Sequence, residues 1–319
     1  MRRLVERTAS WGMDGAMCGM MNILQWRRRA DSSTKAELDA YLDACAPMSR
    51  ENFFRMPPAL RLRHHAGWID WDTPLPSGFP ENDRARVRFY PAARRDAPVL
   101  LLLHALMSAS DAGYRRVAAT FNRRGWAVAF PHLPYHYSRT PKKSLNGELA
   151  ITADLVRNAE GLRQGVVELR QIMAILRARG VREFGLIGTS YGGWIGALLS
   201  FLECDFRFLA LVQPIVNVEK AIWENPGASS MRRSLRSLGH AHNQIARHEH
   251  LISPLHGIPL CDPERIIVTA GLYDRVSPRE DLEALAKLWK GSRLLHVRQG
   301  HFGYRALRET IRAVEPFVD

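Results

Sequence analysis

Residues 184–193 read FGLIGTSYGG, an apolar run that leads through Gly188-Thr189-Ser190-Tyr191-Gly192 into a second apolar segment. The first run has the composition of a buried strand, and the segment after the turn has that of a helix. A serine on so tight a strand-to-helix turn needs small residues two positions away on either side, because larger side chains would collide across the turn. Gly188 and Gly192 meet this need. The turn would aim the Ser190 hydroxyl at the helix N-terminus, where free N–H groups and the helix dipole favour a developing oxyanion.

A serine hydroxyl is a weak nucleophile until a base takes its proton and a third group orients that base. Asp274 follows one late apolar run and His301 follows the last one, so the chain order is serine, aspartate, histidine. Taken singly, Asp274 would also suit a helix cap and His301 a hydrogen bond to a backbone carbonyl. Asp262 is the reserve acid, although proline follows it and no strand precedes it. Together, the order and the strand ends predict a catalytic group of Ser190, Asp274 and His301.

A second backbone donor to the oxyanion is expected after an early strand. The apolar run 99–103 leads directly into His104-Ala105-Leu106. We expect the N–H groups of Leu106 and Tyr191 to form the oxyanion hole. His104 then braces the loop.

Apolar runs of strand length alternate with helical segments along most of the chain. The runs lie at 87–90, 99–103, 126–130, 184–187, 208–212, 265–269 and 294–297. Helical segments lie at 114–124, 150–179, 194–201 and 278–290. Runs without polar positions are typical of strands buried on both faces. The pattern predicts an α/β fold with a mostly parallel, roughly eight-stranded sheet and helices on both faces.

The first third and one later zone break this alternation. Alternating residues at 60–63 and the turn-rich stretch 74–83 predict antiparallel strands that lead into the core. The zone 217–264 is polar and rich in histidine, and its position predicts a helical lid insertion above the carboxyl edge of the sheet, where ligands bind in open α/β folds. We therefore expect a basic N-terminal segment with leading strands at 1–85, packed on an α/β core at 86–319 that carries the lid insertion.

These motifs resemble those of serine hydrolases of the α/β-hydrolase superfamily, over about residues 86–310. The resemblance rests on the oxyanion motif at His104-Ala105-Leu106, the nucleophile elbow at Ser190, the Gly-x-x-Asp loop ending at Asp274 and the Gly-His pair ending at His301. It implies the α/β-hydrolase fold and hydrolysis of a carboxylic ester or thioester through an acyl-enzyme, without metal or cofactor. The family usually has glycine in place of Ala105, and alanine would be strained there if the backbone needed a positive φ.

A narrower resemblance is to the abhydrolase-domain type eighteen proteins. It rests on Pro134-Tyr135-His136, on Arg139 and on the long helical segment with Gln164 and Arg170. This branch would imply a hydrolase that acts on lipid acyl groups.

Polar residues after two other apolar runs are candidates for the substrate cleft. His132, His136 and Arg139 follow one run, and Gln213 follows another. Arg139 suits a phosphate or carboxylate group, which it can bind bidentately. With His104, we take His136, Arg139 and Gln213 as the predicted substrate-binding residues. The same side chains would also suit the bracing of loops.

The chain has 45 Lys and Arg against 32 Asp and Glu, a net charge of +13. Such a field favours anionic partners such as phosphorylated substrates, acidic membrane surfaces or nucleic acid. No nucleic-acid-binding motif is present, so we expect no such partner. The Met-rich segment 11–26 precedes three arginines at 27–29 and suits an anionic lipid surface. It would equally suit a helix packed on the main domain or a loose terminus.

No run of 18 apolar residues is present, and charged residues interrupt the start of the chain, so neither a membrane span nor a signal peptide is predicted. Four well-separated cysteines without C-x-x-C spacing favour a reducing compartment. We expect a cytoplasmic protein, with peripheral membrane contact as an option. The sequence does not indicate its oligomeric state.

Two other functions stay open. The Ser-Tyr-Gly-Gly run is similar to that of prolyl-oligopeptidase-type peptidases, but about 85 residues before the core are too few for their propeller domain. A non-catalytic binding module for anionic membranes is the second alternative. Paired histidines at 240 and 242 and at 248 and 250 invite a metal site, but no further ligand completes the spacing, and a polar lid helix is favoured.

Overall fold

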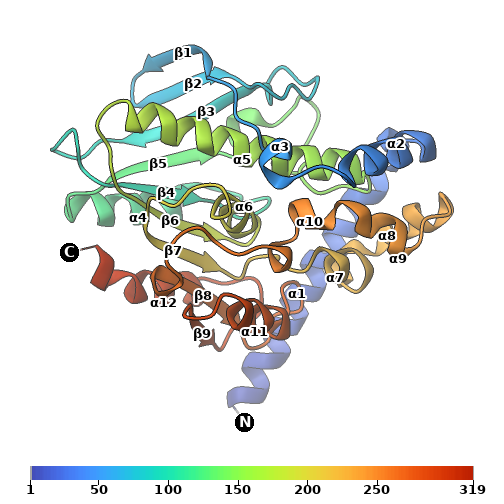
Figure 1. The fold of residues 1–319 in the computed structure, drawn as a ribbon. Coiled ribbons are helices and arrows are strands. Elements are labelled where there is room, and N and C mark those ends of the chain that lie inside the picture. The colour runs from blue at the N-terminus through green and yellow to red at the C-terminus, as the bar shows by residue number, and fades with distance from the viewer. Residues whose placement is uncertain (1, 319) are drawn as a thin grey trace.

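One sheet runs through the molecule (Figure 1). The computed structural model describes residues 2–318. Met1, the first residue of the predicted range 1–85, and Asp319, the last residue of the predicted range 86–319, lie outside the described residues. Across 2–318 the sheet has nine strands: β1 (Leu60–His65), β2 (Trp68–Asp72), β3 (Arg84–Tyr90), β4 (Val99–Leu103), β5 (Ala127–His132), β6 (Phe184–Thr189), β7 (Phe206–Val212), β8 (Ile266–Gly271) and β9 (Arg293–Val297). Their order is β1-β2-β3-β5-β4-β6-β7-β8-β9.

The sheet is antiparallel at one edge and parallel elsewhere. β1, β2, β3 and β5 pair antiparallel in turn, and all pairs from β5 through β4 to β9 are parallel. The central strand β4 consists of five buried aliphatic residues, VLLLL, because helices cover both faces of the sheet. The predicted fold class is confirmed. The strand number is nine and not eight, since the leading hairpin of β1 and β2 extends the antiparallel edge.

Helices cover the two faces in separate groups. α4 (Ala112–Arg123) and α12 (Arg305–Ala313) bury their apolar residues on one face. On the other face α5 (Leu155–Arg177), α6 (Tyr191–Leu199) and α11 (Arg279–Leu288) enclose the larger core. α5 begins later than predicted, because the Asp154 carboxylate caps it by accepting hydrogen bonds from the N–H groups of Val156 and Arg157.

The lid insertion lies between β7 and β8 and is helical, as predicted. It contains α7 (Val218–Trp223), α8 (Ser229–Ser237), α9 (His242–Ile245) and α10 (Glu249–Ile252). In Figure 1 these helices form a layer beside the sheet, at the end where the parallel strands have their carboxyl ends. The lid insertion therefore covers the edge at which the Ser190 turn emerges.

The N-terminal segment forms a long helix, α1 (Arg2–Arg27), followed by α2 (Lys35–Cys45) and α3 (Arg50–Phe53). α1 runs past α7 and α8 (Figure 1) and packs on the lid insertion. The Asn22 amide donates a hydrogen bond to the Pro226 carbonyl at 2.8 Å, and the Gln25 amide donates one to the Gly227 carbonyl at 3.0 Å. These bonds show that the segment is a docked helix and not a loose terminus.

Candidate active site

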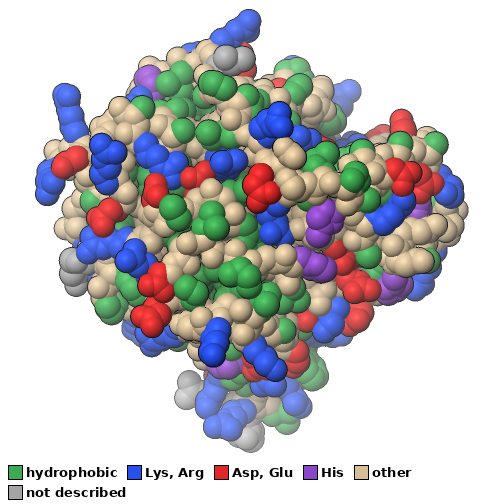
Figure 2. All heavy atoms as spheres, in the orientation of Figure 1, with side chains coloured by type: hydrophobic (Ala, Val, Ile, Leu, Met, Phe, Trp, Pro, Cys, Tyr) green, Lys and Arg blue, Asp and Glu red, His purple; other side chains and the backbone are tan. Residues whose placement is uncertain are grey.

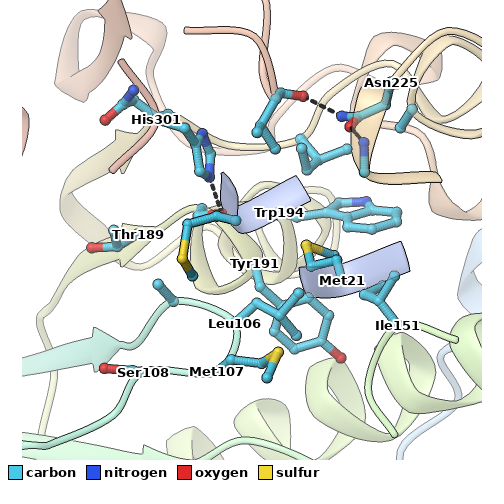
Figure 3. A pocket seen from close by; sticks show the side chains of 18 of the residues that line it. Met21, Leu106, Met107, Ser108, Ile151, Thr189, Tyr191, Trp194, Asn225 and His301 are labelled. Atoms are coloured by element: carbon cyan, nitrogen blue, oxygen red, sulfur yellow. Dashed lines mark hydrogen bonds between the residues drawn. The ribbon is translucent and has the colours of Figure 1, made fainter. Parts of the chain in front are cut away.

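Three side chains from distant parts of the chain meet in one hydrogen-bonded line. The Ser190 Oγ lies 2.8 Å from the His301 Nε2, and the His301 Nδ1 lies 2.9 Å from the Asp274 Oδ2. Figure 3 shows His301 pointing into the cavity, with its hydrogen bond drawn as a dashed line. This is the geometry in which an imidazole takes a proton from a hydroxyl while a carboxylate orients it.

Ser190 sits on a sharp turn between β6 and α6. Its φ of 50° and ψ of −110° are rare for a residue with a Cβ. A Cβ at position 188 would lie 2.5 Å from the Gly192 carbonyl oxygen, and one at position 192 would lie 2.6 Å from the His104 carbonyl oxygen. The predicted need for glycine on both sides of Ser190 is confirmed. The tight turn places the Ser190 hydroxyl above the carboxyl edge of the sheet.

The Asp274 carboxylate is held by a dense set of donors. Its Oδ1 accepts hydrogen bonds from the N–H groups of Val276 at 2.8 Å and Ser277 at 2.9 Å. Its Oδ2 accepts from the Ser277 hydroxyl at 3.0 Å and from the Gln213 amide. So many donors fix the carboxylate in place toward the imidazole. Asp262, the reserve acid, is exposed and caps a short turn by accepting from the Glu264 N–H.

The electrostatics of His301 suit a base. Burial lowers its pKa, but the charge and hydrogen bond of Asp274, together with the charge of Asp14, outweigh burial and raise the pKa above its ordinary value. The imidazole therefore has a stronger affinity for a proton than burial alone would allow. That affinity is what proton transfer from the Ser190 hydroxyl requires.

Three consecutive N–H groups follow β4, and two of them are already engaged. The Ala105 N–H donates to the Tyr114 hydroxyl at 2.9 Å, and the Met107 N–H donates to the His136 Nε2 at 3.1 Å. Within the described chain no hydrogen bond engages the N–H of Leu106 or that of Tyr191, the first residue of α6. The arrangement leaves the two predicted donors free on the cavity wall.

The concern about alanine in the oxyanion motif is resolved by the backbone. Ala105 does not have a positive φ; Met107, two residues later, has a φ of 52°. The Met107 N–H bond to the His136 ring holds this unusual backbone in place. Ala105 is therefore accommodated without strain.

Asp14 of α1 is a site residue that sequence reasoning missed. Its carboxylate accepts hydrogen bonds from the His301 N–H at 3.0 and 3.2 Å and from the Arg275 N–H at 3.1 Å. Nearby, the Ser10 hydroxyl oxygen accepts one from the Gly300 N–H at 3.2 Å. α1 thus anchors the loops that carry both the histidine and the aspartate. The available signal was that Asp14 is the only charged residue between positions 8 and 26.

The hydroxyl opens into an apolar cavity of about 680 Å³, a size typical of ligand pockets. Its wall comes from α1, the loop after β4, α5, α6 and the lid insertion. Figure 3 shows Met21, Leu106, Ile151, Tyr191 and Trp194 around it. No Asp, Glu, Lys or Arg is among the described residues that line it, and burial lowers the pKa of one lining histidine, His248, to about 4. The cavity therefore suits an uncharged apolar group.

The structure corrects the predicted placement of Arg139 and His136. Arg139 is 1% exposed, and its guanidinium pairs with the Glu168 carboxylate and bonds the carbonyls of Asn82 and His132. His136 is fully buried between the Pro134 carbonyl and the Met107 N–H, and burial lowers its pKa to about 4. Neither lines the cavity. Their polar atoms are bonded to other parts of the protein, so neither side chain is free to bind a substrate. Both side chains brace loops instead.

His104, His132 and Gln213 also differ from the prediction. His104 is fully buried and bonds the Leu133 N–H and the Ala105 carbonyl, which fits the bracing role but not substrate binding. His132 contacts the Ser138 hydroxyl and lies off the cavity. Gln213 does line the cavity, but its amide bonds Asp274, the Gly300 carbonyl and the Gln299 side chain. It positions the carboxylate and has no free polar atom for substrate.

The four paired histidines of the lid insertion take separate places. His242 stacks on Trp223, His248 bonds the Ile245 carbonyl, and His250 bonds the Met48 carbonyl. His240 is buried. Across residues 2–318, no group of three or more His, Cys, Asp or Glu side chains is arranged to hold a metal ion.

Comparison of the sequence with models of known protein families gave no match, nor did comparison with curated proteins. Comparison of the structure did find similar proteins. An acetyl xylan esterase from Paenibacillus sp. R4 has a TM-score of 0.59 at 14% identity, covering 92% of this chain and 98% of that one. Acetyl xylan esterase 1 from Thermoanaerobacterium sp. JW/SL YS485 has a TM-score of 0.57 at 16% identity, covering 88% and 93%. The α/β hydrolase GrgF from Penicillium sp. sh18 has a TM-score of 0.52 at 13% identity, covering 79% and 96%.

This chain has the α/β-hydrolase fold. At such low identity the likeness establishes the fold alone, since one fold carries many activities. The function must therefore be argued from the site. The narrower similarity to the abhydrolase-domain type eighteen branch stays a prediction.

Proposed function

We propose that this protein is a serine hydrolase that cleaves a carboxylic ester or thioester with an apolar acyl group. The observation that carries the proposal is the hydrogen-bonded line from Ser190 through His301 to Asp274 at the wall of an apolar cavity. Two solved structures of the same fold are named acetyl xylan esterases, which agrees with ester hydrolysis and carries no argument for the acyl group.

In the proposed mechanism, the Ser190 Oγ attacks the acyl carbonyl carbon while the His301 Nε2 takes the hydroxyl proton. Asp274 stabilises the resulting imidazolium through its charge and its bond to the Nδ1. The N–H groups of Leu106 and Tyr191 donate to the oxyanion of the tetrahedral intermediate. His301 then gives its proton to the leaving alkoxide or thiolate, and an acyl-enzyme forms. Water, deprotonated by the same imidazole, hydrolyses the acyl-enzyme and restores Ser190.

The cavity supports an acyl group that is long and uncharged. Burial of each methylene is worth about 0.8 kcal/mol, or about a fourfold gain in kcat/KM when the chain lies in the pocket in the transition state. With p-nitrophenyl esters of increasing length we expect kcat/KM to rise by about this factor per methylene until the cavity is filled. A flat series, or a preference for acetyl esters, would contradict the proposed acyl group.

A fluorophosphonate probe tests the nucleophile directly. The unmodified protein should be labelled, and Ser190→Ala should abolish labelling. Ser108→Ala is a matched control, because Ser108 lines the same cavity without contacting His301, and it should keep the label. Absence of labelling in the unmodified protein would refute the hydrolase proposal and favour the non-catalytic binding module. Cleavage of peptide amides in preference to esters would favour the peptidase.

A further inference from the structure

The outward face of α1 is unusual for an exposed helix. Between Thr8 and Trp26 the only charged residue is Asp14, and it is buried against the His301 loop. The other exposed positions in this stretch are apolar or small. A surface helix of a globular protein ordinarily presents charged and polar residues to water. Several large apolar residues exposed along one helix are typical of an interaction site.

Large apolar side chains are exposed within this stretch and just before it. Val5 and Ile23 are 62% and 64% exposed, and Trp11 and Trp26 are also exposed. We call these four residues the α1 strip. The α1 strip runs from Val5 to Trp26, which at about 1.5 Å per residue is about 32 Å along the helix.

Arginines bracket the α1 strip at both ends. Arg3 and Arg7 lie on either side of Val5 at its first end, and Arg27 and Arg29 follow its last tryptophan. The Arg7 guanidinium lies 4.9 Å from the centre of the Trp11 ring, and that of Arg29 lies 3.5 Å from the Trp26 ring. In Figure 2 the projecting tip of α1 carries basic side chains beside apolar ones, whereas charges of both signs are mixed over the rest of that face.

The cavity opens beside this helix. Met13, Met20 and Tyr304 all line the cavity and are exposed, so they lie at its rim. Met13 and Met20 belong to α1 itself. An acyl chain that enters the cavity therefore passes an apolar rim that continues into the α1 strip.

We propose that α1 docks in the plane of an anionic membrane, with the α1 strip among the headgroups and first acyl carbons and the arginines on lipid phosphates. Charge complementarity favours an anionic membrane as the partner, because the chain carries a net charge of +13 and arginines flank the α1 strip. Tryptophan side chains with neighbouring arginines also suit the boundary between lipid and water. Docking in this way turns the rim toward the lipid. That the substrate comes from the membrane rests on the proposed function, whereas the docking itself does not. No helix within residues 2–318 is long and apolar enough to cross a membrane, so the contact is peripheral.

Co-sedimentation of the full chain with vesicles tests the docking. We expect binding to vesicles of equal parts phosphatidylglycerol and phosphatidylcholine, and much weaker binding to phosphatidylcholine alone. Raising the ionic strength from about 0.1 M to about 1 M, which shortens the screening length from about 10 Å to about 3 Å, should weaken it. Ile23→Ser with Trp26→Ser should lower the partition by about tenfold or more, since two large apolar side chains are lost from the lipid contact.

A matched control removes exposed apolar residues elsewhere. Ile258→Ser with Leu260→Ser makes the same kind of change on another exposed segment and should leave vesicle binding unchanged. Equal binding to neutral and anionic vesicles, no binding to either, or equal loss in both double variants would overturn the proposal. A dimer in solution that dissociates in the Ile23 and Trp26 variant, without vesicle binding, would assign the α1 strip to a second copy instead.

Two readouts separate this proposal from the proposed function. The Ser190→Ala protein should bind vesicles as the unmodified chain does, because Ser190 lies inside the cavity. The Ile23 and Trp26 variant should keep its activity on a soluble ester and lose most of its activity on an ester embedded in anionic vesicles. Vesicle binding without any esterase activity would refute the proposed function alone.

Discussion

Replacement of Asp14 tests whether α1 belongs to the active site or only covers it. Asp14→Ala removes the acceptor for two backbone N–H groups, those of His301 and Arg275. An unsatisfied buried donor costs about 1–3 kcal/mol. Burial raises the pKa of Asp14, which means that its charged form is costly to bury. Removal of the carboxylate relieves this cost and so offsets part of the loss. We expect the free energy of unfolding to fall by about 2 kcal/mol.

The larger expected effect is on catalysis. A displacement of a reacting group by about 1 Å can cost about 10² in rate, and the lost bonds hold the backbone of His301 itself. We expect kcat/KM on a soluble ester to fall by about 100-fold, mainly through kcat. The negative charge of Asp14 also raises the pKa of His301. A base acts in its neutral form, so losing this charge should move the acid limb of the pH profile to lower pH.

Two comparisons make the result decisive. Asn22→Ala is the control, because Asn22 ties the same helix to the lid insertion without contacting the His301 loop. Asp14→Asn removes the charge but keeps one acceptor oxygen, so it should shift the acid limb with a smaller loss of stability. If Asp14→Ala and Asn22→Ala lower kcat/KM equally, or if the acid limb of both Asp14 variants stays in place, the positioning role is refuted.

The other predictions concern two buried carboxylates. Asp274→Asn should lower kcat by orders of magnitude and shift the acid limb of the pH profile to lower pH, because the charge and hydrogen bond of Asp274 counter the effect of burial on the pKa of His301; an acid limb that stays or moves up would contradict this. Glu168→Gln should lower the free energy of unfolding by about 3–5 kcal/mol, because the buried Arg139 loses its charge partner. Denaturant unfolding measures it, and Asp96→Asn, at an exposed pair, should change it by less than about 1 kcal/mol.

Local patterns predicted the fold well because they obey local physics. The apolar sequence of β4 follows from the burial of both faces of the sheet. The glycines at the Ser190 turn follow from the close approach of the chain across that turn. Both features can be recognised from residues adjacent in the sequence. The order of Ser190, Asp274 and His301 was also predictable, since the carboxyl ends of parallel strands meet at one edge. The positions of the strand ends in the sequence are enough to predict that the three residues lie at the same edge.

The polar residues behind the site were predicted less well. Arg139 follows a strand and has the chemistry of an anion-binding residue, yet its partner Glu168 comes from the middle of α5. Gln213 follows another strand, and its amide turns to Asp274 instead of the substrate. The partner of a polar side chain depends on the distances between elements. These distances cannot be deduced from the spacing of residues within one element.

The sequence by itself determined which segments are buried strands, where the strained serine stands and in what order the three reacting groups follow. Only the tertiary structure decided that α1 walls the cavity and that its Asp14 holds the His301 loop, a contact that spans 287 positions. The reason is physical. A strand or a tight turn is selected by the burial and sterics of adjacent residues, whereas a hydrogen bond between distant segments depends on how the whole chain packs.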